Sequence, residues 1–277
     1  MTHGFFKALL FLCAGSVIHA LHHEQDMRKM GGLFKKMPQT TILMWIGSLA
    51  IIGFPFFSGY YSKESILETA YFTNSNIALY AYTVGILTAF LTAFYSWRLL
   101  FMTFHGNSRV SQEEISNIYE SPKVMIIPLV ILAIGSIFSG LFFVNYFVGS
   151  EKDIFWQSSI VIHHHYDYHM PFIQTLIIKS SIAFGIVLAA IIYFYKKEFA
   201  KILMKNLNPI YKISLNKWYI DELYNIIFTK PVFFLASFFW KRGDQKSIDN
   251  FGPDGVSRLI NMLARSASRI QTGFLYH

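Results

Sequence analysis

Two ionisable residues near the start of the chain lie within an apolar stretch. His3 and Lys7 are four residues apart, so they share one face of a helix, and an apolar run follows Lys7 as far as Ala14. Burial disfavours the charged form of a lysine, and a lysine inside a membrane can therefore exchange a proton. Alternatively, both side chains reach water at the membrane surface. The spacing alone leaves both interpretations open.

A second group follows a predicted break in a long apolar stretch. Lys63 and Glu64 come after Pro55 and Gly59, and Glu68 lies one helical turn beyond Glu64. A neighbouring carboxylate stabilises the ammonium form of a lysine, and losing that pairing favours release of the proton. This pattern indicates a site that holds and releases protons. The alternative is a simple ion pair at the outer surface of the membrane.

Weaker candidates are found elsewhere in the chain. Lys179 follows Pro171 by eight residues, and its side chain is expected to extend to the membrane surface. His19 lies at the inner end of the first apolar stretch, where it can take up protons or be solvated. A polar connection contains His163, His164, His165, Asp167 and His169. Adjacent histidines lack the spacing of a structural metal site, so this connection is expected to be a solvated loop that holds no resident metal.

Five apolar stretches of membrane-spanning length would position these residues. They cover residues 2–20, 40–72, 77–104, 123–147 and 172–195. The chain is 53% hydrophobic and only 14% charged, whereas soluble domains carry about 25% charged residues. Runs of about 20 apolar residues match a hydrocarbon layer of about 30 Å. The predicted fold class is therefore all-α and integral to a membrane, with five transmembrane helices.

The second of these stretches is too long for one straight helix. It covers 33 residues and contains Gly53, Pro55 and Gly59. Proline cannot donate a backbone hydrogen bond, and a broken helix inside a membrane is tolerated where it is buried in protein or lines a wet cavity. We expect this helix to be broken, although an ordinary proline kink without function is the alternative.

Basic residues gather in the connections at 21–39, 105–122 and 196–217. Lys152 is the only Lys or Arg in the connections at 73–76 and 148–171. By the positive-inside rule, the first three connections face the cytoplasm, or the matrix in a mitochondrion. The net charge of +8 therefore indicates membrane orientation rather than nucleic-acid binding. The single cysteine excludes an intrachain disulfide framework, and no nucleotide-binding loop or other cofactor site is expected.

The predicted domains are a bundle at 1–195, a connection at 196–217 and a long amphipathic helix at 218–277. In the last segment, apolar residues follow helical spacing while arginines occupy other faces. We expect this helix to lie along a membrane surface, with an interruption or bend at 241–254. The alternative makes 218–240 a sixth span, which would take charged residues into lipid at about 2.5–3.5 kcal/mol each.

Three sequence motifs resemble one family. They are THGFFKALLFL at residues 2–12, HEQDMRKMGGL at 23–33 and YYSKESI at 60–66. They resemble subunit 5, or L, of proton-pumping NADH:quinone oxidoreductase, respiratory complex I, and the resemblance covers essentially the whole chain. It implies that Lys7 matches the central lysine of the proton path, and His3 the histidine before it. It also implies that Lys63 matches the lysine of the outward half-channel, with Glu64 in the acidic position beside it.

The resemblance also implies partners and a location. The partners would be other membrane-arm subunits of complex I, including neighbouring antiporter-like subunits, together with the lipid bilayer and the N-terminal half of the same subunit. Family members have about ten further spans before this region and one after the lateral helix, so we expect a C-terminal piece. The location would be a bacterial inner membrane, or the mitochondrial inner membrane. A multisubunit Na⁺/H⁺ antiporter or membrane-bound hydrogenase subunit, or a non-pumping structural fragment, are the alternatives.

Overall fold

The computed structural model describes residues 1–160, 170–270 and 273–276, and every regular element among them is helical. The chain divides into two compact units, Met1–Ile202 and Leu203–His277. The helices of the first unit are α1 (Thr2–Ala20), α2 (Pro38–Ile52), α3 (Ser58–Phe72), α4 (Asn76–Thr103), α5 (Gln112–Asn117), α6 (Lys123–Phe147), α7 (Lys152–Trp156) and α8 (Phe172–Ala190). A π-helical turn at Ile191–Tyr195 extends α8, and α9 (Lys197–Asn206) follows it.

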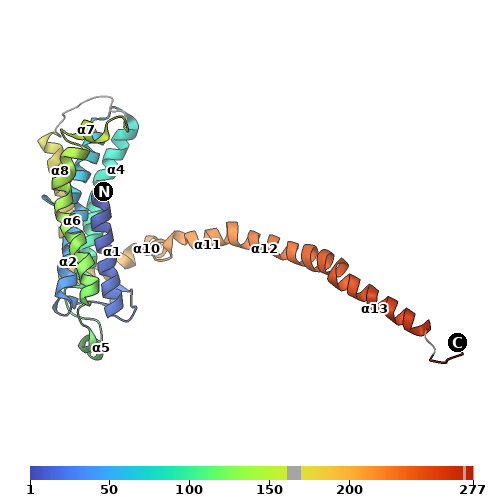
Figure 1. Cartoon of the computed structure of the whole chain (residues 1–277). Coiled ribbons are helices and arrows are strands. Elements are labelled where there is room, and N and C mark those ends of the chain that lie inside the picture. The colour runs from blue at the N-terminus through green and yellow to red at the C-terminus, as the bar shows by residue number, and fades with distance from the viewer. Residues whose placement is uncertain (161–169, 271–272, 277) are drawn as a thin grey trace. The chain divides into compact units, whose positions relative to one another are not determined.

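The long helices of the first unit run side by side as one bundle (Figure 1). α1 packs on α2 and α6, α3 packs on α6, and α4 packs on α8. A shared apolar core includes Leu9 and Cys13 of α1, Ile52 of α2, Leu100 of α4 and Leu129 of α6. Many large apolar side chains outside this core are exposed on the surface of the bundle. Such a surface is stable only against an apolar environment, such as lipid or a protein partner.

Four of the predicted spans are confirmed as continuous helices with nearly the predicted bounds. α1, α4, α6 and α8 with its π-helical turn are each long and apolar enough to cross a membrane. The predicted second span, 40–72, is confirmed as broken, because it forms α2 and α3, which have 15 residues each. Each half is about 22 Å long, so neither crosses a layer of about 30 Å alone.

The two basic connections of the bundle meet at the same end, as the charge pattern predicts. The backbone N–H of Phe34 donates to the carbonyl of Phe104, and Arg109 donates to the carbonyls of Met27 and Arg28. These bonds join connection 21–39 to connection 105–122. At the opposite end, Glu68 accepts from the backbone N–H at Met170.

The second unit consists of helical segments joined end to end. They are α10 (Asn208–Leu215), a 3-10 turn (Lys217–Tyr219), α11 (Ile220–Tyr224), a π-helical turn (Asn225–Thr229), α12 (Lys230–Phe238), a π-helical stretch (Phe239–Asp249) and α13 (Pro253–Ile270). A bend with positive φ angles at Lys217, Trp218 and Tyr219 precedes the long helical stretch. The stretch Lys217–Ile270 is itself long and, in part, apolar enough to cross a membrane.

The expected interruption or bend at 241–254 coincides with a change of helix type, because the π-helical stretch ends at Asp249, Gly252 lies in a turn and α13 begins at Pro253. The backbone N–H of Gly252 donates to the carbonyl of Ile248, and that of Val256 donates to the carbonyl of Gly252. Pro253 stands at the first position of α13, where the N–H that proline lacks would have no helical acceptor. The hydrogen bonding has the π form over Phe239–Asp249 and the α form in α13.

Candidate functional site

The break between α2 and α3 ends α2 in a specific way. The N–H of Gly53 donates to the carbonyl of Ala50, and the N–H of Phe54 donates to the carbonyl of Leu49. Gly53 has φ of +77°, so these bonds form the common glycine-terminated helix end. Pro55 follows and has no N–H to donate. The carbonyls of Ile51 and Ile52 are therefore left without helical donors, at the negative end of the helix dipole.

Lys63 of α3 supplies the missing donor. Its Nζ lies 3.3 Å from the carbonyl oxygen of Ile51 and 3.2 Å from that of Ile52. The side chain is half-buried and passes Gly53, where an added Cβ would lie 3.4 Å from the lysine Cδ. A positive charge at the carboxyl end of a helix is electrostatically favourable. Lys63 is therefore the cap of a half-helix that ends inside the bundle.

A small cavity beside Lys63 is lined by residues of both α3 and α8. It has a volume of about 30 Å³, and a cavity on this scale needs about 10–15 Å³ to hold one water molecule. Its polar lining comes from Tyr60, Lys63 and Glu64 of α3 and from Thr175 and Lys179 of α8. The cavity can therefore hold a water molecule between an ammonium and a carboxylate, which is an arrangement suited to proton transfer.

Lys179 lies closer to this group than the sequence indicates. Its Nζ is 5.6 Å from the centre of the Tyr60 ring, which is a cation–π contact. Tyr60 is one helical turn before Glu64, and both residues line the cavity. The structure thus brings Lys179 to Lys63 and Glu64, although Lys179 lies more than one hundred residues further along the sequence. Tyr60 was missed, because nothing in its sequence context separates it from an ordinary aromatic residue of a span.

His3 and Lys7 lie on α1 and do not line this cavity. Lys7 is half-buried and His3 is exposed, with its ring 5.1 Å from that of Phe6 in an edge-on contact. Phe6 lies against Gly59, at the start of α3. Lys7 therefore lies at the depth of the helix break, although its side chain points to another face of α1. The four-residue spacing of His3 and Lys7 does place them on one face, as predicted.

The two remaining candidates have different surroundings. Glu68 accepts a hydrogen bond of 2.8 Å from the backbone N–H of Met170, just before α8 begins. This bond ties α3 to the start of α8, so Glu68 is engaged in holding the two helices. His19 is exposed in the last turn of α1. Neither Glu68 nor His19 lines the cavity near Lys63.

Glu120 is a further residue that the sequence did not single out. It accepts hydrogen bonds from the backbone N–H groups of Gln39 and Thr40, at 2.7 and 3.3 Å, and from the Thr40 hydroxyl at 2.6 Å. These donors belong to the first turn of α2. A carboxylate at the amino end and an ammonium at the carboxyl end match both poles of the same helix. The signal was hidden because Glu120 is about eighty residues from the helix that it caps.

His105 is a second such residue, at the basic end of the bundle. Its Nε2 accepts a 3.2 Å hydrogen bond from Nε1 of Trp45, and its ring stacks on that of Phe34. Burial lowers the pKa of His105 below its usual value. The bond and the desolvation both favour the neutral imidazole, which joins α2, α4 and the first basic connection.

Metal binding was not expected from the sequence. Among the described residues, no three His, Cys, Asp or Glu side chains lie close enough together to hold a metal ion. The histidine-rich stretch at 163–169 lies outside the described residues.

Comparison with known proteins assigns both parts of the chain. Residues 1–92 match the family described as the transmembrane region of NADH:quinone oxidoreductase and Mrp antiporters. Residues 95–276 match the C-terminus of NADH dehydrogenase subunit 5. The second match covers most of the chain and is described for subunit 5 without the antiporters.

Curated relatives are similar over the whole chain. NADH-quinone oxidoreductase subunit L of Rickettsia bellii is 42% identical over 100% of this chain and 43% of its own length. NADH-ubiquinone oxidoreductase chain 5 of Chondrus crispus is 40% identical over 100% of this chain and 43% of its own length. Subunit L of Neisseria meningitidis serogroup A is 37% identical over 100% and 45%, respectively. The chain thus spans less than half the length of these relatives.

Proposed function

The chain belongs to the NADH dehydrogenase subunit 5 family, whose C-terminal region it matches, and on that basis we propose that it is the C-terminal part of a proton-translocating membrane subunit of NADH:quinone oxidoreductase. In this proposal the chain carries the outward half of a proton path and performs no redox step itself. Electron transfer in other subunits drives the movement of protons. The match of residues 95–276 to subunit 5 disfavours the antiporter and hydrogenase alternatives.

The observation that carries this proposal is the contact between Lys63 and the open end of α2. Protonated Lys63 complements two carbonyls at the negative end of a half-helix. Glu64 lines the same water-sized cavity and can accept a proton from Lys63 through one water molecule. Lys63 can therefore be charged and bound to the two carbonyls, or neutral after it has given its proton to Glu64. A residue that carries protons requires two such states.

Lys7 supplies the preceding step in this scheme, with His3 one helical turn before it. Lys7 lies at the depth of the break, as the contact between its neighbour Phe6 and Gly59 indicates. A proton that arrives on Lys7 adds a positive charge to α1, which packs on both α2 and α3, and like charges disfavour each other's protonated forms. Charging of Lys7 would therefore promote release from Lys63 toward Glu64.

The partners in this proposal are the neighbouring membrane-arm subunits and the region of subunit L that this chain does not match. The helical segments between Ile220 and Ile270 would lie along the membrane surface and contact those neighbours. From Ile220 to Ile270 the helical segments have a length of about 75 Å, which is far more than a single crossing of about 30 Å needs. The spacing of Leu259, Ile260 and Leu263, with Arg258 and Arg265 on other faces, fits a surface helix.

A complementation experiment tests the function and the partners separately. The chain is expressed, together with the remaining part of subunit L, in a bacterium that lacks the subunit, and NADH-driven proton uptake is measured in inverted vesicles. We expect Lys7→Ala and Lys63→Ala to reduce the protons taken up per NADH oxidised. Lys35→Ala is the matched control, because Lys35 lies in an exposed basic connection.

Two outcomes would overturn different parts of this proposal. Unchanged proton uptake per NADH in both lysine variants would refute the proton path. Absence of the chain from the purified NADH-oxidising complex would refute the assigned partners.

A further inference from the structure

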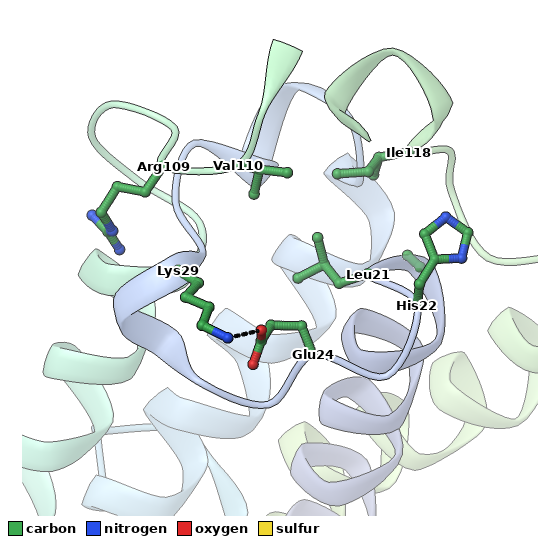
Figure 2. A pocket seen from close by; sticks show the side chains of 8 residues that line it. Leu21, His22, Glu24, Lys29, Arg109, Val110 and Ile118 are labelled. Carbon is green, nitrogen blue, oxygen red and sulfur yellow. Dashed lines mark hydrogen bonds and ion pairs between the residues drawn. The ribbon is translucent and has the colours of Figure 1, made fainter. Parts of the chain in front are cut away.

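A further cavity lies at the basic end of the bundle, away from the proton path proposed above. It has a volume of about 300 Å³ and opens between the end of α1 and the two basic connections. Figure 2 shows the charged side chains around it: Arg109 and His22 lie on opposite sides, and Lys29 lies beside Glu24. Three basic side chains therefore surround the opening, with one carboxylate among them.

The inner wall of the same cavity is apolar. Leu21 and Ile118 are both at least nine-tenths buried, and they lie near Val110 (Figure 2). Ala20 completes this wall. The cavity thus combines a charged rim with an apolar wall. This combination suits a molecule that carries a charged group and an apolar body.

Arg109 is rigidly held at this rim. Its Nε donates to the carbonyl of Arg28, and its Nη2 donates to the carbonyls of Met27 and Met102, at 2.9, 2.9 and 2.6 Å. These bonds fix the plane of the guanidinium, and within the described residues its Nη1 makes no hydrogen bond. A fixed guanidinium with a remaining donor is well suited to bind a phosphate oxygen.

Lys29 already binds an anion, which is the side chain of Glu24. Their Nζ and Oε2 atoms are 2.6 Å apart, but the lysine side chain is 67% exposed and that of the glutamate is 33% exposed. Exposed ion pairs of this kind contribute little to stability, so an external anion can displace the carboxylate. Glu24 marks the position that an anionic ligand would occupy.

We propose that this cavity binds a phosphate group carried by an anionic phospholipid, with Lys29 and Arg109 on the phosphate and the apolar wall against the start of the acyl chains. The location favours a lipid over a soluble phosphate compound. Lys152 is the only Lys or Arg in the connections at the other end, whereas the connections that form the cavity carry Arg28, Lys29, Lys35, Lys36 and Arg109. The basic end is expected to face the side of the membrane whose surface is negatively charged. This inference does not depend on the proton path.

The test uses the full chain purified in a neutral detergent, with thermal unfolding measured against added lipid. Phosphatidylglycerol is expected to raise the melting temperature, whereas phosphatidylcholine should have little effect. Lys29→Gln should weaken the apparent affinity for phosphatidylglycerol about tenfold, as expected for the loss of one charge-assisted hydrogen bond. Glu24→Gln should strengthen it, because the competing carboxylate is removed.

Controls separate this site from general surface charge. Lys35→Gln and Lys36→Gln remove the same charge from the same connection, outside the cavity, and should leave the affinity unchanged. Stabilisation by inorganic phosphate alone, at a similar concentration and with the same dependence on Lys29 and Glu24, would uphold the phosphate site but identify a soluble ligand. Equal losses in Lys29→Gln and Lys35→Gln, or no gain in Glu24→Gln, would overturn the proposal.

Discussion

The Nζ atom of Lys63 lies 3.3 Å from the carbonyl oxygen of Ile51. In an unbroken helix that carbonyl would accept from residue 55, but residue 55 is a proline and has no N–H. The proline that opens the helix and the lysine that closes its exposed end are therefore two parts of one arrangement. At the opposite end of α2, Glu120 caps the first turn. The half-helix is thus held at both poles by side chains of opposite charge from other parts of the chain.

Removing the Lys63 ammonium should destabilise the helix break. Lys63→Met leaves the Ile51 and Ile52 carbonyls without a donor, and we expect the free energy of unfolding to fall by about 1–3 kcal/mol. Lys63→Arg keeps a donor and should lose less. Chemical denaturation of the detergent-solubilised protein, followed by circular dichroism, measures both. Lys179→Met is the control, and a loss as large as that of Lys63→Met would contradict the capping role.

Loss of the Glu120 carboxylate should destabilise α2 from its other end. Glu120→Ala removes the acceptor for two backbone N–H groups and the Thr40 hydroxyl, so we expect a loss of about 1–2 kcal/mol. Glu120→Gln retains one acceptor oxygen and should lie between this variant and the parent. Glu198→Ala breaks only an exposed ion pair with Lys201 and should change stability by less than about 0.5 kcal/mol. The same denaturation experiment compares the three variants, and equal stability of Glu120→Ala and Glu198→Ala would disprove the cap.

Gly59 should tolerate no side chain. A Cβ at this position would lie 1.9 Å from the carbonyl oxygen of Ala50, which is backbone and cannot move without shifting α2. We expect Gly59→Ala to cost about 3 kcal/mol or more. Gly4→Ala is the matched control, because nothing lies within 4 Å of its added Cβ, and it should stabilise α1 by about 0.5–1 kcal/mol. Melting temperatures that fall by the same amount in both variants would rule out the close approach at Gly59.

His105 should make stability depend on pH at the basic end of the bundle. Its pKa is lowered in the folded state by burial, so the unfolded chain binds a proton more readily. The contribution of His105 to the free energy of unfolding is therefore fully present above the ordinary histidine pKa of about 6.5, and it falls as the pH drops below that value. Protonation also removes the lone pair that accepts from Trp45.

Melting temperatures at pH 7.5 and 5.5 test this effect. The parent protein should lose more stability on acidification than His105→Gln, whose amide oxygen can still accept from Trp45 but does not titrate. The exposed His19 provides the control, since His19→Gln should retain the full pH dependence. An unchanged pH dependence in His105→Gln would show that other groups cause it.

The sequence by itself determined the membrane class, the bounds of most helices and the break at Gly53 and Pro55. These features depend on local chemistry: apolar runs of spanning length, a residue that favours positive φ, and a residue without an N–H. His3 with Lys7 and Lys63 with Glu64 were also found locally, because charge within apolar stretches is conspicuous. The roles of these residues in proton transfer stay proposals.

Only the tertiary structure decided which residues meet. Lys179 joins Tyr60, Lys63 and Glu64 of α3 because α8 lines the same cavity, and Glu120 reaches α2 from about eighty residues away. Such contacts depend on how helices pack, which helical periodicity does not specify.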